Sequence, residues 1–321
     1  QAARLCKADL ATRMVYEFPE LQGIMGREYA RLWGEEEAVC RAIDEHYKPR
    51  GGEDGFPSKG PGSFIGIADK LDTIVGYVAL GKIPSGSEDP FGLRRAARGV
   101  LGTVLEHGYP FELKHLIDEA SQLFSPRLPN VNRDMLSMDV WDFLKSRLEN
   151  LFVAEGFRID LIQSVLEARK TRQTDGQIGL PVVQTDIADA KNRLKALTAI
   201  STEKEFEPLT TTFKRVMNII PHGILTIMPQ VKIGLLQENA EKALHTAYEA
   251  RQKEIRSLLG RKEYLEALRE IAALRPAVDQ FFDDVLVMCE DPALRENRLG
   301  LLSSIGELFA QVADFRKIIG P

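Results

Sequence analysis

The residues best suited to chemistry in this chain are a histidine and two aspartates around a loop of glycine, proline and lysine. They lie in the stretch "EHYKPRGGEDGFPSKGPGSFIGIADKLD", where His46 ends one predicted helix and Asp69 and Asp72 lie in the next. Because the two aspartates are three residues apart, both can point to one side of a helix. With His46 they could supply part of a metal site.

A structural interpretation of the same residues is the more usual one. His46 falls on the apolar face of its predicted helix, where a histidine is more often a core residue bonded to the backbone. Aspartates in the first turns of a helix are favoured by the helix dipole alone. The sequence around these three residues therefore predicts either a metal site or a buried structural histidine beside two helix-stabilising carboxylates.

The order "H…DGFP…ADKLD" resembles an HD-domain phosphohydrolase, and Asp69 matches the aspartate of that family's "AD" pair. The resemblance requires an adjacent His-Asp pair upstream, but residues 15–23 read "VYEFPELQG" and no His-Asp pair occurs in the 321 residues. Losing that pair removes two metal ligands from a site that needs several. We therefore expect a vestigial site at His46, Asp69 and Asp72 that holds no metal. A metal-dependent HD-type phosphohydrolase is the alternative.

Composition indicates an ordinary globular chain. Hydrophobic residues make up 44% and charged residues 28% of the sequence, and the net charge is −5. A role with nucleic acid must therefore depend on local basic patches. Three cysteines fit no metal spacing, and their odd number argues against a disulfide framework, so we expect a reducing compartment. No apolar run approaches the ~18 residues of a membrane span. The chain starts at Gln1, and we expect it to be a fragment or processed product.

Helical periodicity dominates the chain and predicts an all-α fold. The stretch "FSPRLPNVNRD", with two prolines and two asparagines, predicts a linker at 126–135 between domains at 1–125 and 136–321. Loops are expected at 171–183 and 219–234. The predicted helices are 5–18, 35–47, 64–80, 90–106, 136–156, 160–172, 186–199, 201–219, 234–259, 261–274, 276–289 and 292–318.

Basic residues of the first domain could form a strip that contacts RNA phosphates. Some lie in or beside the glycine-rich loop, and others lie in "GLRRAARG", where residues four apart share a helix face. If the strip does not form, these side chains simply solvate a helix. The candidates are Lys48, Arg50, Lys59, Lys70, Arg94, Arg95 and Arg98.

The second domain offers a different set of basic residues. Lys214 and Arg215 precede a loop that contains His222, and a loop histidine can stack on a base. Arg295 and Arg298 lie in "RENRLG", three residues apart. The alternative for this pair is structural, with the two arginines bracing the carboxylates of Asp279 and Asp283 on the preceding helix.

Three strings together are similar to one family: "KADLATRMVYEFPELQGIMGREYARLWGE", "ADKLDTIVGYVALGKIPSGSEDPFGLRRAARGVL" and "VDQFFDDVLVMCEDPALRENRLGLL". They resemble the beta subunit of the bacterial-type, two-subunit glycyl-tRNA synthetase, over nearly the whole chain. The resemblance implies an HD-like domain, then helical domains ending in a DALR-type anticodon-binding domain. It corresponds to the C-terminal part of that subunit.

The resemblance also implies the biochemistry. The beta subunit binds tRNA(Gly), and a separate alpha subunit activates glycine with ATP and Mg in an alpha2beta2 assembly. We therefore expect no cofactor and no catalytic residue in this fragment, which alone should not make glycyl-adenylate. No P-loop, "HIGH" or "KMSKS"-like string occurs here, which agrees with that division. We expect a cytoplasmic or organellar protein with no membrane contact. A helical protein-binding adaptor is the second alternative.

Overall fold

The computed structural model describes residues 1–51, 54–84, 88–124, 128, 130–168, 186–220 and 231–319. Every regular element in these ranges is a helix, so the all-α prediction is confirmed. The chain divides into two compact units, unit 1 at Gln1–Leu151 and unit 2 at Phe152–Pro321. Within the described residues no helix has the length and apolar character needed to cross a membrane.

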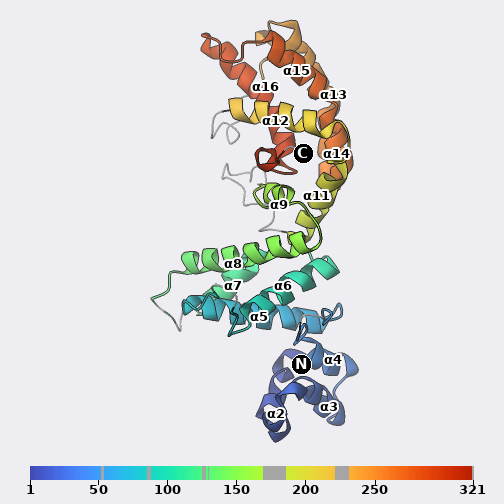
Figure 1. Ribbon diagram of the computed structural model, residues 1–321, viewed down its shortest axis with the longest axis vertical. Helices are drawn as coiled ribbons and strands as arrows, with labels where there is room; N and C mark the ends of the chain where they lie inside the picture. Colours follow the sequence, from blue (N-terminus) through green and yellow to red (C-terminus); the bar gives the residue numbers. More distant parts are fainter. Residues whose placement is uncertain are drawn as a thin grey trace. The chain divides into compact units, whose positions relative to one another are not determined.

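Unit 1 is built around the long helix α5, which packs against α4, α6 and α7 (Figure 1). Ile74 and Val75 of α5, Val100 of α6 and Ile117 of α7 have no exposed surface and form the centre of this packing. The elements of unit 1 are α1 (Ala2–Leu5), η1 (Ala8–Ala11), α2 (Arg13–Glu17), η2 (Pro19–Leu21), α3 (Ile24–Leu32), α4 (Glu37–Glu45), α5 (Pro61–Ala79), α6 (Leu93–His107), α7 (Leu113–Phe124) and most of α8 (Arg133–Ala154).

The predicted helix at 5–18 is wrong in detail, because the segment is broken into α1, η1 and α2. Thr12 is extended, with φ −93° and ψ 148°, and its hydroxyl accepts the N–H of Val15 at 3.4 Å. This cap starts a new helix in the middle of the predicted one. Asp9 is buried just before the break and accepts the N–H of Gly23 at 2.6 Å, which ties the segment to the start of α3.

Two local features fix α6 and the crossing of α4 with α5. Asp89 accepts the N–H groups of Leu93 and Arg94, so α6 begins three residues after the predicted start at Pro90. On α5, a Cβ at Gly66 would lie 2.8 Å from the carbonyl oxygen of His46. A glycine at this position therefore lets the end of α4 approach the α5 backbone closely.

Unit 2 contains the later helices, and most predicted helices of this region are present with shifted ends. The elements are α9 (Ile159–Leu166), α11 (Ile187–Ile200), α12 (Phe206–Ile219), η4 (Ile233–Leu235), α13 (Asn239–Gly260), α14 (Tyr264–Ala272), α15 (Arg275–Asp284), α16 (Pro292–Ala310) and η5 (Phe315–Lys317). The core includes Phe213 of α12, whose ring meets Phe309 and Phe315 at 4.2 and 4.9 Å between centroids. The predicted loops at 171–183 and 219–234 fall largely outside the described residues.

The observed division differs from the predicted domains at 1–125 and 136–321 with a linker at 126–135. It falls after Leu151, within the helix that starts at Arg133. The hydroxyl of Ser137 donates to the carboxylate of Asp118 on α7, at 2.5 Å, and Val140 and Leu144 are fully buried. The first turns of α8 therefore belong to unit 1.

Candidate nucleic-acid interface

The arginines of α6 lie beside the glycine-rich loop, as the predicted basic strip requires. Arg98 donates from Nη1 to the carbonyl of Gly51 at 3.2 Å, and its guanidinium lies 5.7 Å from the centre of the Phe56 ring. The side chain of Arg95 is exposed and makes no hydrogen bond or ion pair among the described residues. Arg94 is half-buried. The structure thus presents one unpaired and two partly engaged cations along a single helix.

The lysines of this set lie in different surroundings. Lys59 is exposed, with Nζ 5.5 Å from the centre of the Tyr109 ring. Lys48 is half-buried and has no side-chain partner in the described part of the chain. Lys70 is packed into the fold, where its Nζ donates to the carbonyl of His46 at 2.7 Å. Burial lowers the pKa of Lys70 to about 8. These lysines are therefore not equivalent sites for a phosphate.

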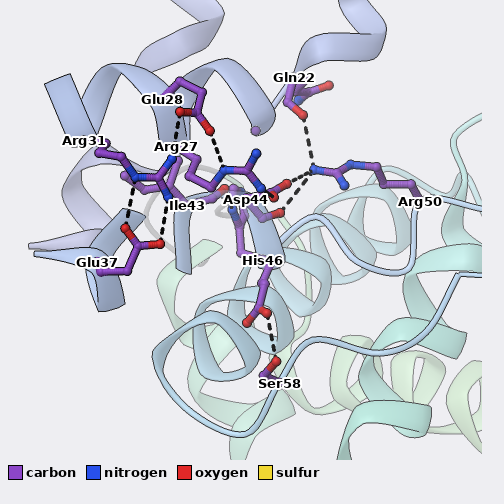
Figure 2. A network of polar contacts seen from close by, with 12 residues as sticks. Gln22, Arg27, Glu28, Arg31, Glu37, Ile43, Asp44, His46, Arg50 and Ser58 are labelled. Atoms are coloured by element: carbon purple, nitrogen blue, oxygen red, sulfur yellow. Dashed lines mark hydrogen bonds and ion pairs between the residues drawn. The ribbon is translucent and has the colours of Figure 1, made fainter. Parts of the chain in front are cut away.

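Arg50 is held inside a polar network, shown in Figure 2. Its guanidinium donates to the carboxylate and carbonyl of Asp44, and Arg27 donates to the same carboxylate at 2.5 Å. Its contact with the Gln22 carbonyl, at 3.4 Å, links it to the segment before α3. Asp44 is buried between two arginines, so the charge of Arg50 is largely neutralised and its main contacts are structural.

His46 is a core residue. It has no exposed surface, and Nδ1 donates to the carbonyl of Ile43 at 2.7 Å. Burial lowers its pKa to about 4, and the nearby charge of Lys7 acts in the same direction. The structural interpretation of this histidine is therefore the one that its contacts support.

The two aspartates of the vestigial site differ in exposure and in their partners. Asp69 accepts a hydrogen bond from the ammonium of Lys7 at 2.9 Å. Asp72 is exposed, and it lines a mainly apolar cavity of about 690 Å³ that Asp69 also lines. In the described ranges no three His, Cys, Asp or Glu side chains lie close enough together to bind a metal ion. These side chains do not fit a metal centre, because a lysine already neutralises Asp69. That the protein holds no metal stays a prediction.

The candidates of unit 2 also separate into exposed and structural residues. Arg215 is exposed, and its guanidinium lies 4.5 Å from the centre of the Phe282 ring, while Lys214 is half-buried. Arg295 is half-buried and donates to the carbonyl of Cys289 at 3.1 Å. His222 lies outside the described residues.

Arg298 is buried and structural, but its partner is not the predicted one. Its Nε donates to Glu241 of α13 at 2.7 Å. Asp279, one of the predicted partners, accepts instead from Thr212 at 2.7 Å and Arg275 at 3.1 Å. Asp283 is exposed. Because its guanidinium is buried, Arg298 is not accessible for the predicted contact with RNA.

Comparison with known proteins covers both units. The family description "Glycyl-tRNA synthetase beta subunit" matches residues 1–167, which is more than half of the chain. The chain belongs to the glycyl-tRNA synthetase beta subunit family. A second match, to the "DALR anticodon binding domain", covers residues 209–318.

Several relatives of this chain carry the name glycine–tRNA ligase beta subunit. The protein of Myxococcus xanthus is 45% identical over 323 residues, which cover 99% of this chain and 44% of the relative. That of Trichlorobacter lovleyi is 42% identical, covering 100% of this chain and 44% of the relative. The protein of Anaeromyxobacter dehalogenans is 40% identical, covering 99% and 43%. The chain thus spans less than half the length of these relatives.

The sequence did not identify Lys7 or the aromatic residues that lie near the vestigial site. Lys7 lies 4.2 Å from the centre of the Tyr47 ring and pairs with Asp69, which is 62 residues away in sequence. Phe91 stacks on Tyr77 with ring centroids 4.4 Å apart. A phenylalanine three residues before the arginines in "PFGLRRAA" was the only local signal.

The buried His46 should make unit 1 less stable against unfolding at acidic pH. Its pKa is about 4 when folded and about 6.5 when unfolded, so the unfolded chain takes up a proton first as the pH falls. Its contribution to stability is complete above pH 6.5 and is lost as the pH falls towards 4. We expect a loss of about 2 kcal/mol in the free energy of unfolding between pH 7 and pH 5.

Urea denaturation followed by tryptophan fluorescence measures this loss, because both tryptophans, Trp33 and Trp141, lie in unit 1. The control is His46→Asn, whose amide can donate to Ile43 but does not titrate. An equal loss of stability in the variant and the original chain would assign the acid sensitivity to other groups.

Proposed function

We propose that this chain is the tRNA-binding part of a glycyl-tRNA synthetase beta subunit, which holds tRNA(Gly) while a separate alpha subunit catalyses aminoacylation. The main support is that one chain contains a match to the beta-subunit family at residues 1–167, followed by a match to an anticodon-binding domain at residues 209–318. In an alpha2beta2 assembly, ATP and Mg would be used by the alpha subunit. The chain would act in the cytoplasm, or in an organelle if it comes from one.

The two units would divide the work. The exposed Arg95 and its neighbours on α6 supply positive charge for the phosphate backbone, which positions an RNA without reading its sequence. In unit 2, Arg215 over the ring of Phe282 offers a cation and an aromatic face for an unpaired base. Identity of the tRNA would therefore be read in unit 2.

Filter binding of tRNA(Gly) to the whole chain at several salt concentrations tests the proposal. Affinity should fall steeply with salt, with a slope of about −0.7 to −0.9 in log K against log salt for each phosphate contact. Absence of binding at low salt would favour the adaptor alternative. Phosphatase activity lost on Asp69→Ala would favour the metal-dependent hydrolase.

A further inference from the structure

A polar cavity of about 370 Å³ lies in unit 1 between the end of α4, the middle of α5 and the start of α6. We call it the Lys70 pocket. Four cations line it, namely Lys7, Arg50, Lys70 and Arg95, together with two carboxylates and the aromatic rings of Tyr47 and Phe91. Its volume lies at the lower end of the range for small-ligand sites, which is room for one nucleotide rather than a duplex.

Within the described residues, two of the four cations form no ion pair. Lys7 pairs with Asp69 at 2.9 Å, and Arg50 pairs with Asp44. Among the described residues neither Lys70 nor Arg95 has a carboxylate within ion-pair distance. The remaining carboxylate of the pocket, Glu20, is exposed and forms no ion pair in the described part of the chain. An anion that enters the pocket would therefore meet two available cations.

Lys70 is held in place by the fold. A Cβ at Gly99 of α6 would lie 2.5 Å from its Cδ, so the lysine stem passes over a glycine that leaves room for it. Its Nζ bonds the carbonyl of His46 at 2.7 Å and approaches that of Gly66 at 3.5 Å. An ammonium has three donors, and two carbonyls leave one unused. A half-buried cation without an ion-pair partner is costly, and a bound anion offsets that cost.

The aromatic wall adds a second kind of contact. Phe91 is 44% exposed although it is large and apolar, and it is supported by stacking on Tyr77 with an interplanar angle of 24°. An exposed aromatic ring beside unpaired cations is the combination that binds single-stranded nucleotides, with the base on the ring and the phosphate on the cations.

We propose that the Lys70 pocket binds one unpaired nucleotide of an RNA strand, with its phosphate on Lys70 and Arg95 and its base against Phe91. This inference rests on the proposed function, because the strand is that of a bound tRNA. A free mononucleotide has the same chemistry, and the experiment distinguishes the two sources.

Equilibrium binding of tRNA(Gly) to the full chain gives the first test. Lys70→Met and Arg95→Met should each weaken binding several-fold and reduce the salt slope by about 0.7, the value for one phosphate contact on a single strand. Phe91→Leu should weaken binding about five- to a hundredfold and leave the slope unchanged. Glu20→Gln removes the carboxylate of the pocket that is not paired with Lys7 and should strengthen binding, an effect that misfolding cannot imitate.

Lys82→Met is the matched control, because Lys82 is exposed, unpaired in the described part of the chain and follows the end of α5 in the same unit. It should change tRNA affinity by less than twofold. Equal affinity of the Lys70, Arg95 and Phe91 variants with the original chain, while tRNA still binds, would overturn the inference and leave the proposed function intact.

Acylation of lysines, read by mass spectrometry, tests the site directly. Bound tRNA should protect Lys70 but not Lys82. Protection of Lys70 by AMP, but not by tRNA, would assign the pocket to a free nucleotide and overturn the RNA strand as its source. If tRNA does not bind the chain at all, both the proposed function and the RNA strand are wrong. Bound tRNA that leaves Lys70 as reactive as before would also overturn the inference.

Discussion

Replacing Glu241 with alanine should destabilise unit 2 by about 3–5 kcal/mol, the cost of removing one partner of a buried ion pair. The side chain of Glu241 is 0% exposed and that of Arg298 is 7% exposed. One carboxylate oxygen accepts from Arg298, and the other accepts the N–H groups of Gln237 and Glu238 at 2.6 and 2.7 Å. Alanine would leave a buried guanidinium and two backbone N–H groups without their acceptor.

Urea denaturation followed by circular dichroism measures this loss, and hydrogen exchange in α13 and α16 assigns it to unit 2. The matched control is Glu203→Ala, which breaks an ion pair with Arg269 whose side chains are 36% and 53% exposed. That pair should contribute less than about 1 kcal/mol. Similar losses in the two variants would mean that burial does not decide the strength of these pairs.

A second substitution separates the cost of the unpaired Arg298 charge from the other losses of stability caused by Glu241→Ala. Arg298→Met in the Glu241→Ala background removes the uncompensated guanidinium, so part of the lost stability should return. The two backbone N–H groups at the start of α13 stay without an acceptor, so recovery should be incomplete. A double variant less stable than Glu241→Ala alone would contradict this account of the pair.

Changing one anticodon base of tRNA(Gly) should weaken its binding to this chain about ten- to a hundredfold. A base edge is fully accessible only in an unpaired loop, and the anticodon-binding match covers residues 209–318. Filter binding of two transcripts that differ in that base, at one salt concentration, measures the ratio. Arg215→Ala should reduce this ratio if the Arg215–Phe282 pair contacts the loop. Equal affinity for both transcripts would place identity reading outside this chain.

The sequence predicted the helical architecture well because apolar periodicity reports which face of a helix is buried. It failed where side chains cap the backbone in the middle of an apolar pattern, as Thr12 does between η1 and α2. It also placed the domain boundary at a proline-rich segment, although the first turns of α8 pack into unit 1 through Ser137 and Val140. Turn-forming residues indicate where a helix ends, but not where packing ends.

The candidate site was less predictable because charge pairing is a long-range property. Arg50, Arg95 and Arg298 look alike in the sequence, yet Arg50 pairs with Asp44, Arg298 pairs with Glu241 and Arg95 is unpaired among the described residues. Lys7 and Lys70 line the same pocket although they are 63 residues apart in the sequence. No local sequence pattern reveals that they lie together. Only the fold decides which cations are available to a ligand.

Photo-crosslinking of tRNA(Gly) to the whole chain tests the central claim most directly. A photoreactive base in the anticodon loop should crosslink to peptides within 209–318, and unlabelled tRNA(Gly) should compete for this crosslink better than a transcript with a changed anticodon. Anticodon-loop crosslinks confined to unit 1, or crosslinks that both competitors remove equally, would contradict the account.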